Sequence, residues 1–124
     1  MSDSEDSVDS GAMRLPIDDP AYQALREGDT ATFSELTAGR GPVDFSYCDL
    51  GGVDLRKVDI VNIRLRGARL KGADLRGLDL SEHDLHGVTL NNARVSGVLF
   101  PAEISADEIR MSLQEGTRLR HKRR

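Results

Sequence analysis

The chain has 124 residues and a mass of 13.6 kDa, the size of one ordinary domain, which argues against a two-domain enzyme with a cleft between its lobes. Tryptophan is absent and only five residues are aromatic, so the core must be filled by aliphatic side chains. The net charge is −4, and no stretch approaches the roughly 18 consecutive apolar residues that a membrane helix needs. The acidic N-terminus lacks the pattern of a signal peptide, so we expect a cytoplasmic protein.

The first 42 residues divide into a tail and a cap. Residues 1–12 contain four acidic residues and no basic one, which predicts a disordered acidic tail. Residues 13–42 predict an N-terminal helical cap: Asp19 and Pro20 begin a helix that stops at Gly28, and Thr30 caps a second helix through Leu36. The apolar contacts expected from this cap are Tyr22, Leu25, Phe33 and Leu36.

Residues 43–102 repeat with a period of five over twelve units without a slip in register. Position one of each unit is small or aliphatic except at His83, position two is often aspartate, and position five is often glycine. Position three is always apolar: Phe45, Leu50, Leu55, Ile60, Leu65, Leu70, Leu75, Leu80, Leu85, Leu90, Val95 and Phe100.

A period of five fits neither a helix nor a flat strand. Residues five apart on an α-helix differ by about 140°, so the apolar positions would spiral around it. On a flat strand, successive apolar residues would fall on opposite faces. The pattern therefore predicts a β solenoid, in which the chain turns a corner after every unit and positions one and three point inward.

These residues resemble the pentapeptide-repeat family, whose unit is A-(D/N)-L-x-x and which GADLRGLDL at 72–80 nearly matches. The resemblance implies a right-handed quadrilateral β-helix with four units per coil, hence about three coils, with short N-terminal helices and one C-terminal helix as caps. Residues twenty apart would then stack, and position two would alternate Asp44 with Arg64 and Asp49 with Arg69 in a ladder of ion pairs. The segment after the repeat also looks like the ending of a small bacterial subgroup of unassigned function.

The C-terminal residues predict a helix and a basic tail. Ser105 and Glu108 form a capping box, and Gly116 ends the helix within the predicted cap 103–117. Its apolar face covers the last coil of the same chain or pairs with a second copy in a homodimer; its members are Ile104, Ile109, Met111 and Leu113. Residues 118–124 predict a solvated basic tail with Arg118, Arg120, Lys122, Arg123 and Arg124.

The candidate chemical groups all have structural explanations, so we expect no enzyme, cofactor or metal. His83 and His86 fall at inward and outward positions, where two imidazoles cannot chelate one ion. Cys48 falls at an inward position and should be an inert buried thiol, and a single cysteine excludes a disulfide framework. The position-two carboxylates face solvent, where nothing would shift their pKa.

Seven bases within 21 residues form a belt around the predicted middle coil: Arg56, Lys57, Arg64, Arg66, Arg69, Lys71 and Arg76. We expect a non-catalytic module that presents a rigid rod to an unidentified protein partner. The resemblance adds a DNA-mimic regulator of an enzyme such as gyrase as one alternative. A third is electrostatic binding of nucleic acid or an anionic surface through the basic tail, although nucleic acid is not favoured because aromatic platforms for base stacking are missing.

Overall fold

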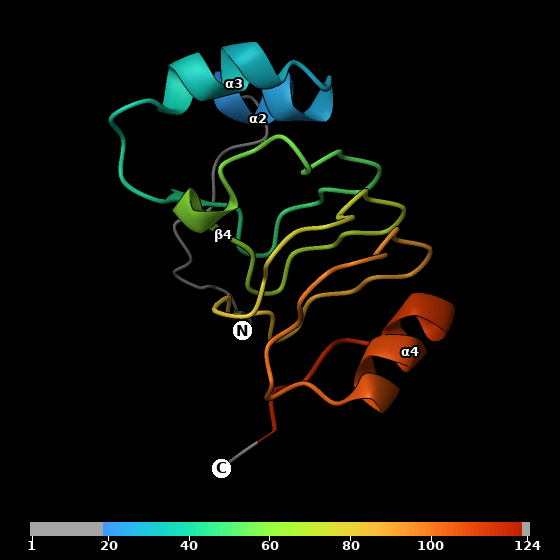
Figure 1. Cartoon of the computed structure of the whole chain (residues 1–124). Coiled ribbons are helices and arrows are strands. Elements are labelled where there is room, and N and C mark those ends of the chain that lie inside the picture. Colours follow the sequence, from blue (N-terminus) through green and yellow to red (C-terminus); the bar gives the residue numbers. More distant parts are fainter. Residues whose placement is uncertain (1–18, 123–124) are drawn as a thin grey trace, which may run out of the picture.

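The computed structural model describes residues 19–122 (Figure 1). The predicted acidic tail 1–12, the start of the predicted cap at 13–18, and Arg123 and Arg124 lie outside the described residues. Two helices lie at one end of a stack of loops and a third lies at the other end. In chain order the elements are α2 (Pro20–Arg26), α3 (Thr30–Thr37), β3 (Val43–Asp44), the 3-10 turn η1 (Ile60–Asn62), β4 (Ile63–Arg64) and α4 (Ala106–Glu115).

Parallel backbone pairing joins residues that are twenty apart. β3 pairs with β4, with Val43 opposite Ile63. The N–H of Leu70 donates to the carbonyl oxygen of Thr89 at 2.9 Å. The same spacing recurs in the bridges Asp49 to Arg69, Arg69 to Thr89, Asp54 to Asp74, Asp74 to Arg94 and Asp79 to Leu99. The predicted stacking interval of twenty residues is therefore confirmed, and the chain has a fold of the β-helix type.

The core is an aliphatic column built from position three of the repeat. Nine of its side chains are at most 1% exposed. Ile60, Val95 and Phe100 are half-buried, because Ile60 lies in η1 and the other two lie in the last units of the repeat. The nine are Phe45, Leu50, Leu55, Leu65, Leu70, Leu75, Leu80, Leu85 and Leu90.

Aspartate recurs at position two because its carboxylate shapes the corner that follows. The Asp49 Oδ1 accepts the N–H of Gly51 at 2.9 Å, and the same bond to the residue two positions on forms at Asp44, Asp54, Asp74, Asp79 and Asp84. Such a side chain satisfies a turn amide that the backbone ladder leaves open. Position five then takes a positive φ, which favours glycine, as at Gly72.

The ladder opens at one corner. Within residues 19–122 no bridge joins Asp59 to Asp79 or Ile63 to His83, and the intervening η1 leaves Val61 81% exposed. Ile60 lies in the 3-10 turn and is half-buried, although it still packs against the core. The polar side chains at 81–84 line the space beside this opening.

The N-terminal helices cover one end of the core much as predicted. The Asp19 carboxylate accepts the N–H of Ala21 at 2.8 Å. Tyr22 and Phe33 are buried, with ring centroids 6.3 and 6.0 Å from that of Phe45. The Tyr22 hydroxyl donates to the Asp49 carbonyl oxygen at 2.6 Å, which ties α2 to the repeat. Leu25 is buried as well.

Two details of this cap differ from prediction. Asp29, not Thr30, is the N-cap of α3, since its carboxylate accepts the N–H of Thr32 at 3.1 Å. Leu36 is 39% exposed because it lies on the side of α3 away from the core.

The helix α4 covers part of the other end, and its predicted cap residues Ser105 and Gly116 are confirmed. The reciprocal half of the predicted capping box is not formed in this way, because both oxygens of the Glu108 carboxylate bond Arg120. The Ser105 hydroxyl accepts the N–H of Glu108 at 3.2 Å, and Gly116 ends the helix at φ 74°. The buried Ser112 hydroxyl accepts the N–H of Leu90 at 2.9 Å. It takes the place of the backbone carbonyl oxygen that a further repeat would offer to this amide.

The predicted apolar face of α4 is confirmed in part. Ile104 is buried, and Ile109 and Leu113 pack half-buried against the core. Met111 is 48% exposed, so it does not take part in covering its own chain. Pairing of this face with a second copy stays a prediction.

Residues 118–122 are not the solvated tail that composition predicted. Leu119 is fully buried, its N–H donates to the Val88 carbonyl oxygen at 2.8 Å, and its carbonyl accepts the N–H of Gly87 at 2.7 Å. Because the residues around Leu119 are basic, the composition of this segment did not indicate a buried apolar side chain. No helix in the described range 19–122 is long and apolar enough to cross a lipid bilayer.

Truncating the core should cost far more than truncating the surface. Leu70 is fully buried, so Leu70→Ala should lower the free energy of unfolding by about 2–5 kcal/mol. Arg69 is exposed on the same strand, and Arg69→Ala should change it by less than about 0.5 kcal/mol. Urea unfolding followed by circular dichroism measures both variants. Equal losses in the two variants would contradict an inward column at position three.

A second test separates close packing from backbone strain. Gly67 and Gly72 have nearly equal φ angles of 69° and 68°, so alanine strains the backbone equally at both. A Cβ at Gly67 would overlap the Tyr47 ring, whereas at Gly72 nothing lies within 4 Å. Gly67→Ala should therefore be less stable than Gly72→Ala by about 1–3 kcal/mol in the same urea assay. A difference near zero would show that the Tyr47 ring does not pack on Gly67.

Candidate functional site

The predicted belt is exposed but is spread over several ladders. All seven bases are exposed to solvent. Arg64 lies in β4 and pairs with Asp44, Arg69 lies on the Asp49 to Thr89 ladder, and Arg56 and Arg76 flank the Asp54 to Arg94 ladder. The belt therefore surrounds the middle of the repeat and does not form one continuous patch.

One part of the belt is neutralised by aspartates. The Arg76 Nη2 lies 2.7 Å from the Asp74 Oδ2, and the Arg56 Nε lies 3.4 Å from the same oxygen. Arg56 also pairs with Asp54 at 2.9 Å. The hydrogen bond from Arg76 is the main cause that lowers the pKa of Asp74 to about 2, so the expectation of unshifted carboxylates is wrong here.

The ion pairs differ from the predicted ladder. Position-two Arg64 and Arg69 do stack beside Asp44 and Asp49 through the backbone. Among residues 19–122, however, the repeat's ion pairs come from the position-four arginines Arg56, Arg66 and Arg76. A position-four guanidinium can curl back over the carboxylate that caps its own turn, as Arg56 and Arg76 do. The predicted ladder placed only position-two residues in its ion pairs.

Four bases of the belt have no ion-pair partner among residues 19–122. They are Arg64, Arg69, Lys57 and Lys71. Arg64, Arg69 and Lys71 follow one another along residues 64–71, and we call these three the open bases. They are the belt's strongest candidates for contact with an acidic surface.

The basic residues of the tail are held on an ordered segment. Arg118, Arg120 and Lys122 are exposed, and they alternate with the buried Leu119 and the half-buried His121 as in a strand. Arg120 pairs with Glu108 of α4 at 2.7 Å, and this hydrogen bond lowers the pKa of the Glu108 carboxyl.

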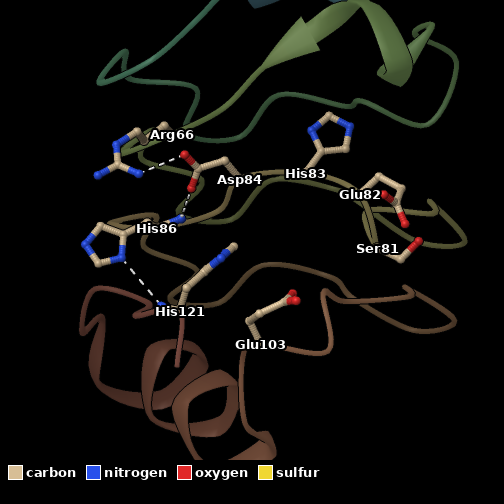
Figure 2. A pocket seen from close by; sticks show the side chains of 8 residues that line it. All are labelled: Arg66, Ser81, Glu82, His83, Asp84, His86, Glu103 and His121. Carbon is tan, nitrogen blue, oxygen red and sulfur yellow. Dashed lines mark hydrogen bonds and ion pairs between the residues drawn. The ribbon is translucent and has the colours of Figure 1, made fainter. Parts of the chain in front are cut away.

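All three histidines of the chain line one hollow of about 520 Å³ (Figure 2). The expectation that His83 and His86 lie on opposite sides is wrong in this respect, because the ladder opens at 81–84 and the tail adds His121 from the far end of the chain. Sequence spacing carried no signal for this grouping. The remaining lining residues are Arg66, Ser81, Glu82, Asp84 and Glu103.

Two of the histidines hold the C-terminal segment in place. The N–H of Leu85 donates to the His121 Nε2 at 3.2 Å, and the N–H of His121 donates to the His86 Nδ1 at 3.4 Å. The two rings stand edge to face with centroids 6.3 Å apart. Figure 2 shows His86 and His121 side by side, with Asp84 bonded to Arg66 above them.

His83 is half-buried at the open corner, not fully inside the core as predicted. Burial lowers the pKa of its imidazole, against a hydrogen bond with the Ile60 backbone that raises it. Within residues 19–122 no three His, Cys, Asp or Glu side chains converge to hold a metal ion. The hollow is therefore a polar cluster of hydrogen bonds and ion pairs.

Cys48 lies at a half-buried position, so its predicted full burial is wrong. It opens the second unit of the repeat and packs against the core. Partial exposure of a thiol does not by itself make a reactive site.

A comparison with protein-family models matches residues 43–72 and 63–100 to Pentapeptide repeats, in eight copies. The match covers the segment in which the bridges join residues twenty apart. No curated protein and no solved structure matches the chain.

The ion pair between Asp74 and Arg76 predicts a pH dependence of stability. The pKa of Asp74 in the folded protein is about 2, below its ordinary 3.8, so its contribution is present above about pH 4 and is lost as the pH falls through 2. Asp74→Asn keeps an oxygen for the Arg76 N–H but loses the charge. We expect it to flatten the decline in urea midpoint between pH 4 and 2.

Arg76→Gln is the matched variant, because it removes the guanidinium and leaves the carboxylate in place. It should flatten the same part of the pH profile. A wild-type slope in both variants would contradict the assignment of the lowered pKa to this pair.

Proposed function

Because the chain is a pentapeptide-repeat protein, we propose that it is a non-catalytic protein-interaction module that presents the outside of its repeats to an acidic protein surface. Pentapeptide repeats are generally protein-interaction modules and generally non-catalytic. We further propose that the twelve units form three coils of a right-handed quadrilateral β-helix. Bridges at a constant interval of twenty residues support four units of five per coil.

The observation that carries the proposal is the contrast between paired and open bases. The repeat backbone fixes each outward side chain at a set place on a rigid ladder. Arg56 and Arg76 are already occupied by Asp54 and Asp74, so a partner would have to displace an internal carboxylate. The open bases face no such competition from residues 19–122 and gain most from a partner's carboxylates.

The exposed surface favours protein over nucleic acid as this partner. Tyr47 is the one exposed aromatic side chain in the described range, at 42%, whereas binding of single strands relies on several stacking platforms. A second copy at the C-terminal end is a further proposed partner, and the exposed Leu99 and Met111 are apolar side chains that it would cover.

The test compares two variants that remove the same number of charges. The first carries Arg64→Gln, Arg69→Gln and Lys71→Gln, and the control carries Arg56→Gln, Arg66→Gln and Arg76→Gln, the three bases that already form ion pairs. Each is used to capture partners from extract of the native host, with and without nuclease treatment, at low and high salt. We expect the open-base variant to lose at least about ten-fold of the captured partner at low salt, whereas the control retains it.

Capture that is equal in wild type and open-base variant, or that disappears with nuclease treatment, would overturn the proposal. The second outcome would favour nucleic acid. Substitutions Arg118→Gln and Lys122→Gln in a third variant report separately on the C-terminal segment, without removing the buried Leu119.

A further inference from the structure

Residues 118–122 occupy the place of an additional rung against residues 85–88. Leu119 exchanges backbone hydrogen bonds with Gly87 and Val88, at 2.7 and 2.8 Å, and its side chain is fully buried. The bond from Gly87 repeats the one by which Gly67 donates to the His86 carbonyl oxygen at 2.9 Å. The C-terminal segment therefore caps the edge of the ladder with the same backbone pattern that joins the repeats to each other.

An imidazole takes the role of a carbonyl in this rung. At position three elsewhere, the amide of Leu50 or Leu70 donates to a backbone oxygen at 2.8 or 2.9 Å. The amide of Leu85 donates instead to the His121 Nε2, and His121 in turn donates its own amide to the His86 Nδ1. Leu85 is fully buried, so loss of this acceptor would leave a buried N–H without a partner.

Both imidazoles can accept these bonds only when they are neutral. A protonated imidazole carries a hydrogen on each nitrogen and has no lone pair with which to accept an N–H. Histidine side chains change charge between about pH 5 and 8, and the two rings are coupled through the same segment. Protonation of either ring therefore removes one of the two bonds that these imidazoles accept between residues 85–86 and residue 121.

We propose that residues 118–122 form a pH-sensitive latch, docked on residues 85–88 while His86 and His121 are neutral and released when these imidazoles are protonated. Release frees the Gly87 amide and the Val88 carbonyl as an open sheet edge and exposes the site of Leu119. It also frees the basic side chains that the docked strand holds in a fixed row.

The charges around the two rings act in both directions. Carboxylates from three parts of the hollow favour a protonated ring: Glu82, Asp84 and Glu103. Asp84 is already bonded to Arg66 at 2.7 Å, and Glu108 of α4 is bonded to Arg120, so both are partly compensated. Nearby positive charge disfavours protonation of the rings in the docked state. It comes from Arg66, Arg118 and Lys122. His83 lines the same hollow and is a further group that can carry positive charge. Added charge on the rings repels this basic segment and promotes release.

Hydrogen exchange followed by NMR on the full chain tests the latch at pH 7.5 and pH 5.5. The amides of Gly87 and Leu119 report on docking, and those of Leu70 and Leu75 report on the repeat itself. We expect the protection factors of the first pair, corrected for intrinsic exchange, to fall at least about ten-fold at pH 5.5. If both imidazoles must be neutral for docking, the linked uptake of two protons can lower these protection factors by up to about 100-fold between pH 7.5 and 5.5. The second pair should change by less than about two-fold.

The decisive variant combines His86→Asn with His121→Gln, whose amide oxygens accept an N–H at either pH. It should keep Gly87 and Leu119 protected at pH 5.5. If the double variant does not fold, the single variant His121→Gln replaces it. Gly87 and Leu119 should then keep part of their protection at pH 5.5, but less than expected for the double variant. His83→Gln is the matched control, because His83 lines the hollow but bonds neither Leu85 nor His121, and it should behave as wild type.

Three outcomes would overturn the latch. Protection of Gly87 and Leu119 that is equal at both pH values shows that neutral imidazoles are not required. A fall shared by Leu70 and Leu75 shows acid unfolding of the whole repeat. An equal fall in wild type and in the folded His86→Asn, His121→Gln variant assigns the effect to other groups.

Discussion

Backbone pairing between residues twenty apart is the constraint on which the rest of the molecule depends. It places each position of the five-residue unit beside its own kind, so leucine stacks on leucine inside and polar residues stack outside. Such pairing is possible only if the chain turns after every unit. The aspartate bonds to the amide two residues on, together with positive φ angles at position five, make these turns regular.

The same regularity decides where charge remains available on the surface. A base at position four can curl back to the aspartate that caps its own corner, as Arg56 and Arg76 do. A base at position two replaces that aspartate and loses the carboxylate of its own unit, as at Arg64 and Arg69. Arg64 and Arg69 are therefore open because of the position they occupy, and Lys71 belongs to the same unit as Arg69, which has no aspartate to receive it. The open bases distinguish this surface from the neutralised ladder beside it.

The ends of a ladder expose amides and carbonyls, and side chains of the caps satisfy several of them. Tyr22 of α2 donates its hydroxyl to the Asp49 carbonyl at one end. At the other end the Ser112 hydroxyl accepts from Leu90, and His121 accepts from Leu85. A hydroxyl serves at any ordinary pH, whereas an imidazole accepts only when neutral. The choice of histidine is what makes one part of the C-terminal cap sensitive to protonation.

The sequence by itself determined the inward column and the caps at Asp19, Ser105 and Gly116, because each follows from local periodicity or from residues within one turn. The interval of twenty was implied by the resemblance to the pentapeptide-repeat family, and the backbone bridges bear it out. Tertiary structure alone decided which arginines are neutralised, where the ladder opens at Ile60–Asn62, and how the three histidines meet. The physical reason is separation along the chain. His86 and His121 come together only after α4 has folded back over the repeat, and the apolar anchor Leu119 is concealed in a basic segment whose composition predicts solvation.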